Sequence, residues 1–193
     1  MNKLITSSLA ALALAASAQA ATITYIAILD GASEAPPNAS PGTGLAMITV
    51  DDIARTIGFQ VTFSGLLGTT TNAHIHAATA IAGAGTAGVA TQNPLIGFPL
   101  GVTGGSFTGS LDMNLAASFN TPYVTANGGT PVAAFTALNQ AIIDKKAYFN
   151  IHSSAVGAGE IRGFLVPAPV PEPTSLSLLA AGSMLGLIRR RRK

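Results

Sequence analysis

The sequence has no cysteine and no tryptophan, and charged residues make up only 9% of its 193 residues. Without cysteine the protein has neither a disulfide nor a thiol nucleophile, so packing alone must stabilise it. The 48% hydrophobic content excludes the intrinsically disordered class, which combines low hydrophobicity with high net charge. The sequence therefore indicates one packed domain between two unusual ends.

Positive charge is scarce in the body of the chain. The formal net charge is +2, but five of the ten basic residues are the last five of the chain, and Lys3 lies at the other end. Residues 21–170 contain four basic and seven acidic residues, a net charge of −3. Because phosphate binding requires clustered Lys and Arg, nucleic acid is excluded as a partner.

Residues 1–20 are typical of a secretory signal peptide. Lys3 gives a positive start, residues 9–18 are apolar, and Ala18 and Ala20 form a small-x-small cleavage pattern. The apolar run is too short for a membrane-spanning helix. We therefore expect passage through the Sec translocon and cleavage by signal peptidase between Ala20 and Ala21.

Residues 169–193 combine Pro171-Glu172-Pro173, an apolar run at 176–188 and a terminal cluster of Arg and Lys. This tail resembles the PEP-CTERM sorting signal. The resemblance implies a Gram-negative bacterium that makes extracellular polysaccharide, and an exosortase that processes the chain near Pro171, Glu172 and Pro173. The apolar run, shorter than the ~20 residues of a comfortable transmembrane helix, would be a transient inner-membrane anchor before delivery to the cell surface or matrix.

Short β-rich runs fill most of residues 21–168. They lie at 22–29, 44–50, 56–63, 72–76, 105–111, 147–152 and 161–166. The second and third runs are joined by the polar residues 51–55, which predicts a hairpin. The pattern predicts a mainly β fold, an antiparallel β-sandwich.

One helix is predicted in a loop near 131–144. Thr130 can cap it and Pro131 suits its first position. Its apolar residues recur at helical spacing: Val132, Phe135, Leu138 and Ile142. A literal G-x-G-x-x-G at 83–88 lacks the preceding strand, following helix and later acidic residue of a dinucleotide site, so a loop is predicted there.

All three histidines fall in two motifs. His74 and His76 form an H-x-H, and on a strand both side chains point to one side. His152 ends the run 147–152, and Glu160 and Arg162 share a side of the next run. If these runs are neighbouring strands, every histidine can meet one carboxylate and one guanidinium.

These motifs resemble the CHRD domain. The resemblance rests on the segments 29–31 (LDG), 34–37 (EAPP), 73–76 (AHIH) with the glycine-rich loop after it, 148–152 (YFNIH) and 159–163 (GEIRG). It covers about residues 22–166 and implies an immunoglobulin-like β-sandwich in a secreted or cell-surface protein. It implies no particular activity.

A second likeness is to copper–zinc superoxide dismutases. By that likeness His74 and His76 match the copper-binding pair, His152 a late ligand and Arg162 an anion-guiding arginine. The chain has no further histidine to bridge to zinc and no cysteine pair, so complete dismutase chemistry does not follow. Two interpretations stay open: a three-histidine copper or zinc site, and a structural polar cluster in which Glu160 pairs with Arg162.

No residue is assigned a catalytic role. The chain has no G-x-S-x-G motif, and no pair of carboxylates stands in a distinguishing context. We therefore expect a non-enzymatic protein that is exported to the cell surface or exopolysaccharide matrix, where it binds polysaccharide or protein. The alternative is an extracellular copper- or zinc-binding protein centred on the three histidines.

Overall fold

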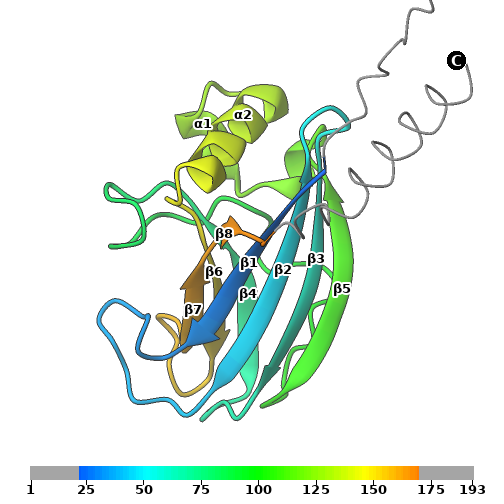
Figure 1. Cartoon of the computed structure of the whole chain (residues 1–193). Helices are drawn as coiled ribbons and strands as arrows, with labels where there is room; N and C mark the ends of the chain where they lie inside the picture. The colour runs from blue at the N-terminus through cyan, green and yellow to red at the C-terminus, as the bar shows by residue number, and fades with distance from the viewer. Residues whose placement is uncertain (1–21, 170–193) are drawn as a thin grey trace, which may run out of the picture.

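A computed structural model describes residues 22–169 of the chain (Figure 1). The strands are β1 (Ile23–Asp30), β2 (Thr43–Asp51), β3 (Thr56–Ser64), β4 (Thr70–His76), β5 (Gly105–Asp112), β6 (Tyr148–Ser153), β7 (Ile161–Phe164) and β8 (Val166–Pro167). The helical segments are η1 (Ala116–Ser118), α1 (Thr121–Ala126) and α2 (Pro131–Ile143). Each predicted β-rich run corresponds to a strand, and the last run is divided between β7 and β8.

The strands form one antiparallel sheet. Its order is β4-β6-β7-β1-β2-β3-β5, and β8 pairs with β1. β2 and β3 pair from Thr43 with Ser64 to Asp51 with Thr56, which confirms the predicted hairpin. β6 is the central strand of the three that carry the histidines and Arg162, because β4 pairs with one of its edges and β7 with the other.

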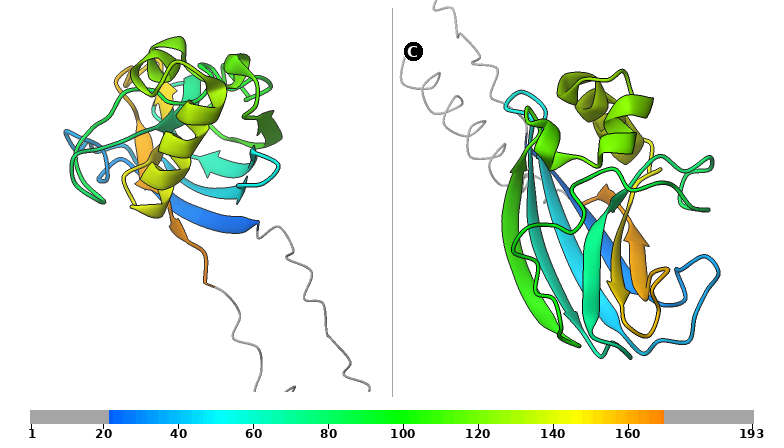
Figure 2. Two further views of the ribbon diagram at one scale, coloured as in Figure 1. Left: turned by 90° about the horizontal axis from the view of Figure 1, so that it is seen from above. Right: turned by 180° about the vertical axis from the view of Figure 1, so that it is seen from behind.

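The sheet curls so that its two halves face each other, and the core lies between them (Figures 1 and 2). Alternation places Phe59 on the inner side of β3 and Phe149 on the inner side of β6, and both are buried. Their ring centroids are 6.3 Å apart, so side chains from the two halves meet directly. The mainly β, sandwich-type architecture is confirmed, and a single continuous sheet builds both layers.

The predicted helix is confirmed as α2. Thr130 accepts a hydrogen bond from the N–H of Ala133 at 3.2 Å, and Pro131 begins the helix. Of the apolar residues at helical spacing, Phe135, Leu138 and Ile142 are buried, whereas Val132 is 47% exposed. At ~100° per residue, Val132 lies roughly a right angle away from the buried side of the helix. The short α1 was not predicted, because six residues are too few to show a period.

The ends of the chain fall outside the described residues. These ends hold the expected signal peptide with its Ala20–Ala21 junction, the Pro171-Glu172-Pro173 motif and the predicted anchor. Within residues 22–169, no helix has the length and hydrophobicity needed to cross a membrane.

Candidate metal centre

Strand register brings the predicted site residues together. It pairs His74 with Asn150 and Asn150 with Arg162, and it pairs His76 with Tyr148. Directly paired residues of neighbouring strands project to the same side of a sheet. The H-x-H, the late histidine and Arg162 therefore lie on neighbouring strands, which is the condition under which the sequence brings them together.

This polar side of the sheet is covered rather than open to solvent. Ile75 points into the apolar core, whereas His74 and His76 point to the other side and are still only 2% and 8% exposed. The long connection from β4 to β5 folds back over them, and the N–H of Ala90 donates to the carbonyl of Ile75. Strand alternation predicted the direction of the histidines, whereas their burial depends on this connection and on neighbouring side chains such as Tyr148.

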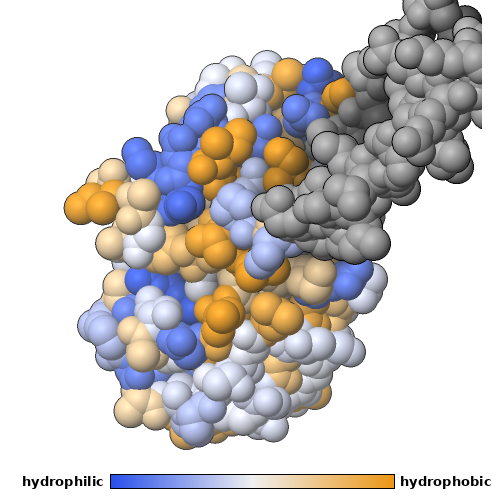
Figure 3. All heavy atoms as spheres, viewed as in Figure 1, coloured by the Kyte–Doolittle hydropathy of each residue, from blue (hydrophilic) through white to orange (hydrophobic). Residues whose placement is uncertain are grey.

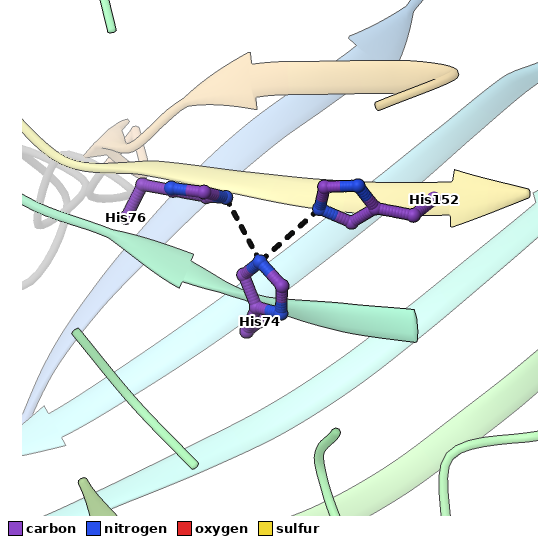
Figure 4. Close-up of side chains that lie close together, drawn as sticks. All are labelled: His74, His76 and His152. Carbon is purple, nitrogen blue, oxygen red and sulfur yellow. Dashed lines mark hydrogen bonds between the residues drawn. The ribbon is translucent and has the colours of Figure 1, made fainter. Parts of the chain in front are cut away.

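The three imidazole rings converge (Figure 4). Nε2 of His74 lies 2.9 Å from Nε2 of His76 and 3.1 Å from Nε2 of His152. One ligand atom from each ring lies within 4.8 Å of the other two. The distances from His74 to each partner suit an ion at the ~2.0–2.1 Å typical of metal–imidazole bonds.

The far nitrogens of two of the rings hydrogen-bond to backbone carbonyls. Nδ1 of His76 lies 2.8 Å from the carbonyl oxygen of Ala87, and Nδ1 of His152 lies 3.0 Å from that of Gly157. A carbonyl oxygen can only accept, so each Nδ1 carries the hydrogen and donates it. Nε2 of both rings therefore keeps a free lone pair when the ring is neutral.

The same tautomer follows for His74. Its Nδ1 lies 3.3 Å from Oδ1 of Asn72. The amide group of Asn72 is oriented by its Nδ2, which donates to Oδ1 of Asn93, so its oxygen is the atom that faces the ring. All three histidines thus direct Nε2 lone pairs at one another.

At neutral pH the rings do not take up protons that would remove the repulsion between these lone pairs. Burial lowers the pKa of His74 to about 3 and that of His76 to about 4, and it also lowers the pKa of His152. The cluster is therefore neutral near pH 7, with no proton to place between nitrogens 2.9 and 3.1 Å apart. Neutral imidazoles whose second nitrogens are held by acceptors are typical of metal ligands.

Tyr148 lies between His76 and Arg162. Its ring stacks on that of His76 with centroids 4.6 Å apart and planes at 8°, and the guanidinium carbon of Arg162 lies 4.6 Å from the Tyr148 centroid. The guanidinium donates to the carbonyls of Ser33 and Gly85 and is almost fully buried. This placement does not fit the anion-guiding role that the superoxide dismutase likeness implied for Arg162.

The two acidic residues near this side of the sheet have different partners. Arg162 Nε lies 3.6 Å from Oε2 of Glu34, so the predicted pairing of Arg162 with Glu160 was wrong. The Glu160 carboxylate is completely buried and accepts hydrogen bonds at 2.5–3.3 Å from Leu67 N–H, Gly68 N–H and the Ser40 hydroxyl. Among the described residues this carboxylate contacts no histidine, because its hydrogen bonds are made with the loops after β1 and β3.

Several supporting groups had no assigned role from the sequence. Asn72 continues the alternation of the H-x-H by one step, so that periodicity could have identified it. Tyr148 lies four residues before His152 on the same strand, so alternation also places it on this side of the sheet. The carbonyls of Ala87 and Gly157 carry no side-chain signal at all, because backbone groups bond the rings.

The fold and the site define the class of this protein: a sandwich-type antiparallel β domain with a buried three-histidine cluster on one covered side of its sheet. The CHRD domain family model matches residues 25–165, so the chain belongs to the CHRD domain family. The PEP-CTERM protein-sorting motif matches residues 169–193. No curated protein and no solved structure matched the chain.

These two matches concern the export and processing of the protein. It is an exported protein of a Gram-negative bacterium, and its tail directs processing by an exosortase. The resemblances to the CHRD domain and to the PEP-CTERM signal are thereby confirmed.

Proposed function

We propose that the CHRD domain of this exported protein binds a late transition-metal ion, copper or zinc, through Nε2 of His74, His76 and His152. The observation that carries the proposal is the convergence of three lone pairs from rings whose other nitrogens donate to oxygen acceptors. Without an ion, two contacts of 2.9 and 3.1 Å bring lone pairs together, which is electrostatically unfavourable. A bound cation removes that repulsion, and imidazole suits both copper and zinc.

The donor set supports binding rather than hydrolysis or group transfer. Three protein ligands leave a coordination position open, as in many reactive sites. Among the described residues, however, no free carboxylate or hydroxyl that could act as a base contacts the cluster. We therefore propose a metal-binding protein and assign no reaction to it.

Metal analysis of the purified protein tests the proposal. After loading with copper or zinc and removal of unbound ion, we expect one ion per chain, and less than a tenth of that in His76→Ala. The matched control is Gln60→Ala, which changes an exposed polar side chain of β3 and should bind as the unaltered protein does. Absence of stoichiometric metal, or equal metal in all three proteins, would contradict the proposal.

Binding of matrix polysaccharide or protein is the second candidate. A shallow hollow of about 180 Å³ lies on the outer side of β2, β3 and β5 and combines apolar Leu45 and Met47 with polar Gln60 and Thr108. The face of the molecule seen in Figure 3 also carries apolar patches among polar residues. We expect Gln60→Ala to weaken co-sedimentation with purified exopolysaccharide, and His76→Ala to leave it unchanged. Equal co-sedimentation of all proteins would remove this candidate.

Delivery to the cell surface or matrix is the expected consequence of the tail. Cells that lack exosortase should retain the unprocessed protein in the inner membrane, whereas cells that contain it should release the processed form. Fractionation followed by immunoblotting measures both. Equal release from the two strains would contradict the expected route.

A further inference from the structure

The donor set of the three-histidine cluster carries no negative charge. Its ligand atoms are neutral imidazole nitrogens, and the acceptors behind them are the carbonyls of Ala87 and Gly157 and the amide oxygen of Asn72. The nearby carboxylates, Glu34 and Glu160, have their partners elsewhere. An ion bound here would therefore keep its full charge in a buried setting.

The buried ion pair of Arg162 and Glu34 lies behind one of the ligands, so it supplies no net negative charge to an ion there. Arg162 is packed against Tyr148, which in turn stacks on His76. His76 is only 8% exposed, and the cost of burying an uncompensated charge rises steeply with its magnitude. These surroundings favour a monovalent ion over a divalent one.

The spacing of the nitrogens is unequal. His74 lies close to both partners, whereas the ring centroids of His76 and His152 are 6.0 Å apart, compared with 4.6 and 4.7 Å for the other two pairs. An ion at ~2.0–2.1 Å from Nε2 of His74 and of one partner would have an N–metal–N angle of roughly 90–100°, and the wider spacing of the other two rings indicates a wider angle between His76 and His152. This is closer to a T than to the tetrahedron that zinc prefers.

The two outer ligands are also fixed in place. Hydrogen bonds of 2.8 and 3.0 Å to backbone carbonyls hold the His76 and His152 rings, and Tyr148 covers the first of them. Closing the wider angle to reach tetrahedral geometry would break these contacts. A filled-shell monovalent ion with two or three ligands needs no such rearrangement.

We infer that this cluster selects copper and holds it as the monovalent ion in preference to divalent copper and divalent zinc. The inference rests on the proposed metal-binding function and adds the identity and charge of the ion. Divalent copper normally binds nitrogen ligands more tightly than zinc, so an ordinary three-imidazole site would favour Cu²⁺ over Zn²⁺. Preference for the monovalent state is what distinguishes this site.

Competition titrations test the inference. The protein is titrated without oxygen with Cu⁺ against a chromophoric Cu⁺ chelator, and separately with Cu²⁺ and Zn²⁺ against chelators of known affinity. We expect Cu⁺ to bind at least ~100-fold more tightly than either divalent ion, a difference of ~2.7 kcal/mol. Equal or tighter binding of Cu²⁺ or Zn²⁺ overturns the inference but leaves the metal site intact, whereas no binding of any ion defeats the proposed function itself.

Single-histidine variants test the geometry behind the inference. His74→Ala leaves His76 and His152 as opposed ligands, so Cu⁺ affinity should fall by less than ~tenfold while Zn²⁺ binding is lost. His152→Ala removes one of the opposed ligands and should weaken Cu⁺ by ~100-fold. Far-UV circular dichroism checks folding, and His74→Asn replaces the alanine variant if that protein unfolds. Equal loss of Cu⁺ affinity in folded His74 and His152 variants overturns the T-shaped arrangement.

Discussion

Glu34 is the acidic group whose charge the fold tolerates least. The residue is only 7% exposed, and its Oε1 has no hydrogen-bond partner among the described residues. Burial raises the pKa of Glu34 from 4.5 to about 7, although Arg162 and the N–H of Ala35 act in the opposite direction. A folded protein that binds this proton more tightly than the unfolded chain loses stability as the pH rises.

Substitution of Glu34 by Gln should therefore stabilise the protein at alkaline pH. The Glu34 contribution is fully present below the unfolded pKa of 4.5 and is lost as the pH rises through about 7. Linkage between these two pKa values gives about 2.5 kcal/mol of change between pH 5 and pH 8. Gln keeps the shape of the side chain but does not titrate, so Glu34→Gln should gain about 2.5 kcal/mol over the unaltered protein across that range.

Urea unfolding of metal-free protein, followed by circular dichroism at pH 5 to pH 8, measures this difference. Subtraction of the two proteins cancels the titration of the histidines, which both share. Glu160→Gln is the matched control, because hydrogen bonds from Ser153, Ser40 and two N–H groups outweigh burial and lower the pKa of Glu160. Its stability relative to the unaltered protein should fall, not rise, between pH 4 and pH 8. A pH-independent difference for Glu34→Gln, or the same sign for both variants, would refute this reasoning.

Three further predictions follow from the structure. Below pH 6.5 the metal-free protein should lose stability, by about 2 kcal/mol at pH 5 for each of His74 and His76. The reason is that their lowered pKa values keep both rings neutral in the folded protein, while the same histidines take up protons in the unfolded chain. Urea titrations measure this loss, and added metal should restore the lost stability. Gly163→Ala should cost about 2 kcal/mol or more in thermal unfolding, because its Cβ would overlap a backbone carbonyl of β1, whereas Gly157→Ala meets open space and should change stability by less than about 0.5 kcal/mol. Thr130→Ala should cost about 1 kcal/mol of unfolding free energy by loss of the α2 cap, and an unchanged value would show that the cap contributes little.

Local patterns were sufficient to predict the strands, the hairpin and the helix. The Thr and Ile content of the β1 run and the Thr130-Pro131 start of α2 act within a few residues, so sequence reasoning reaches them. The alternation of side chains along a strand placed His74 and His76 on one side of it. The predictions failed where the surroundings of a residue depend on segments that are distant in the sequence. Glu160 was expected beside the histidines, but a loop more than ninety residues away in the sequence supplies its partners.

The sequence by itself identified the sorting tail, the β character, the lack of disulfides and the three histidines as the metal-ligating candidates, because each follows from composition or short-range spacing. Only the tertiary structure decided that β6 lies between β4 and β7, and that the connection after His76 covers the cluster. It also moved Arg162 from a guiding role to a support stacked on Tyr148. The physical reason is that burial, tautomer and charge balance depend on contacts between segments far apart in the chain, and no local pattern encodes them.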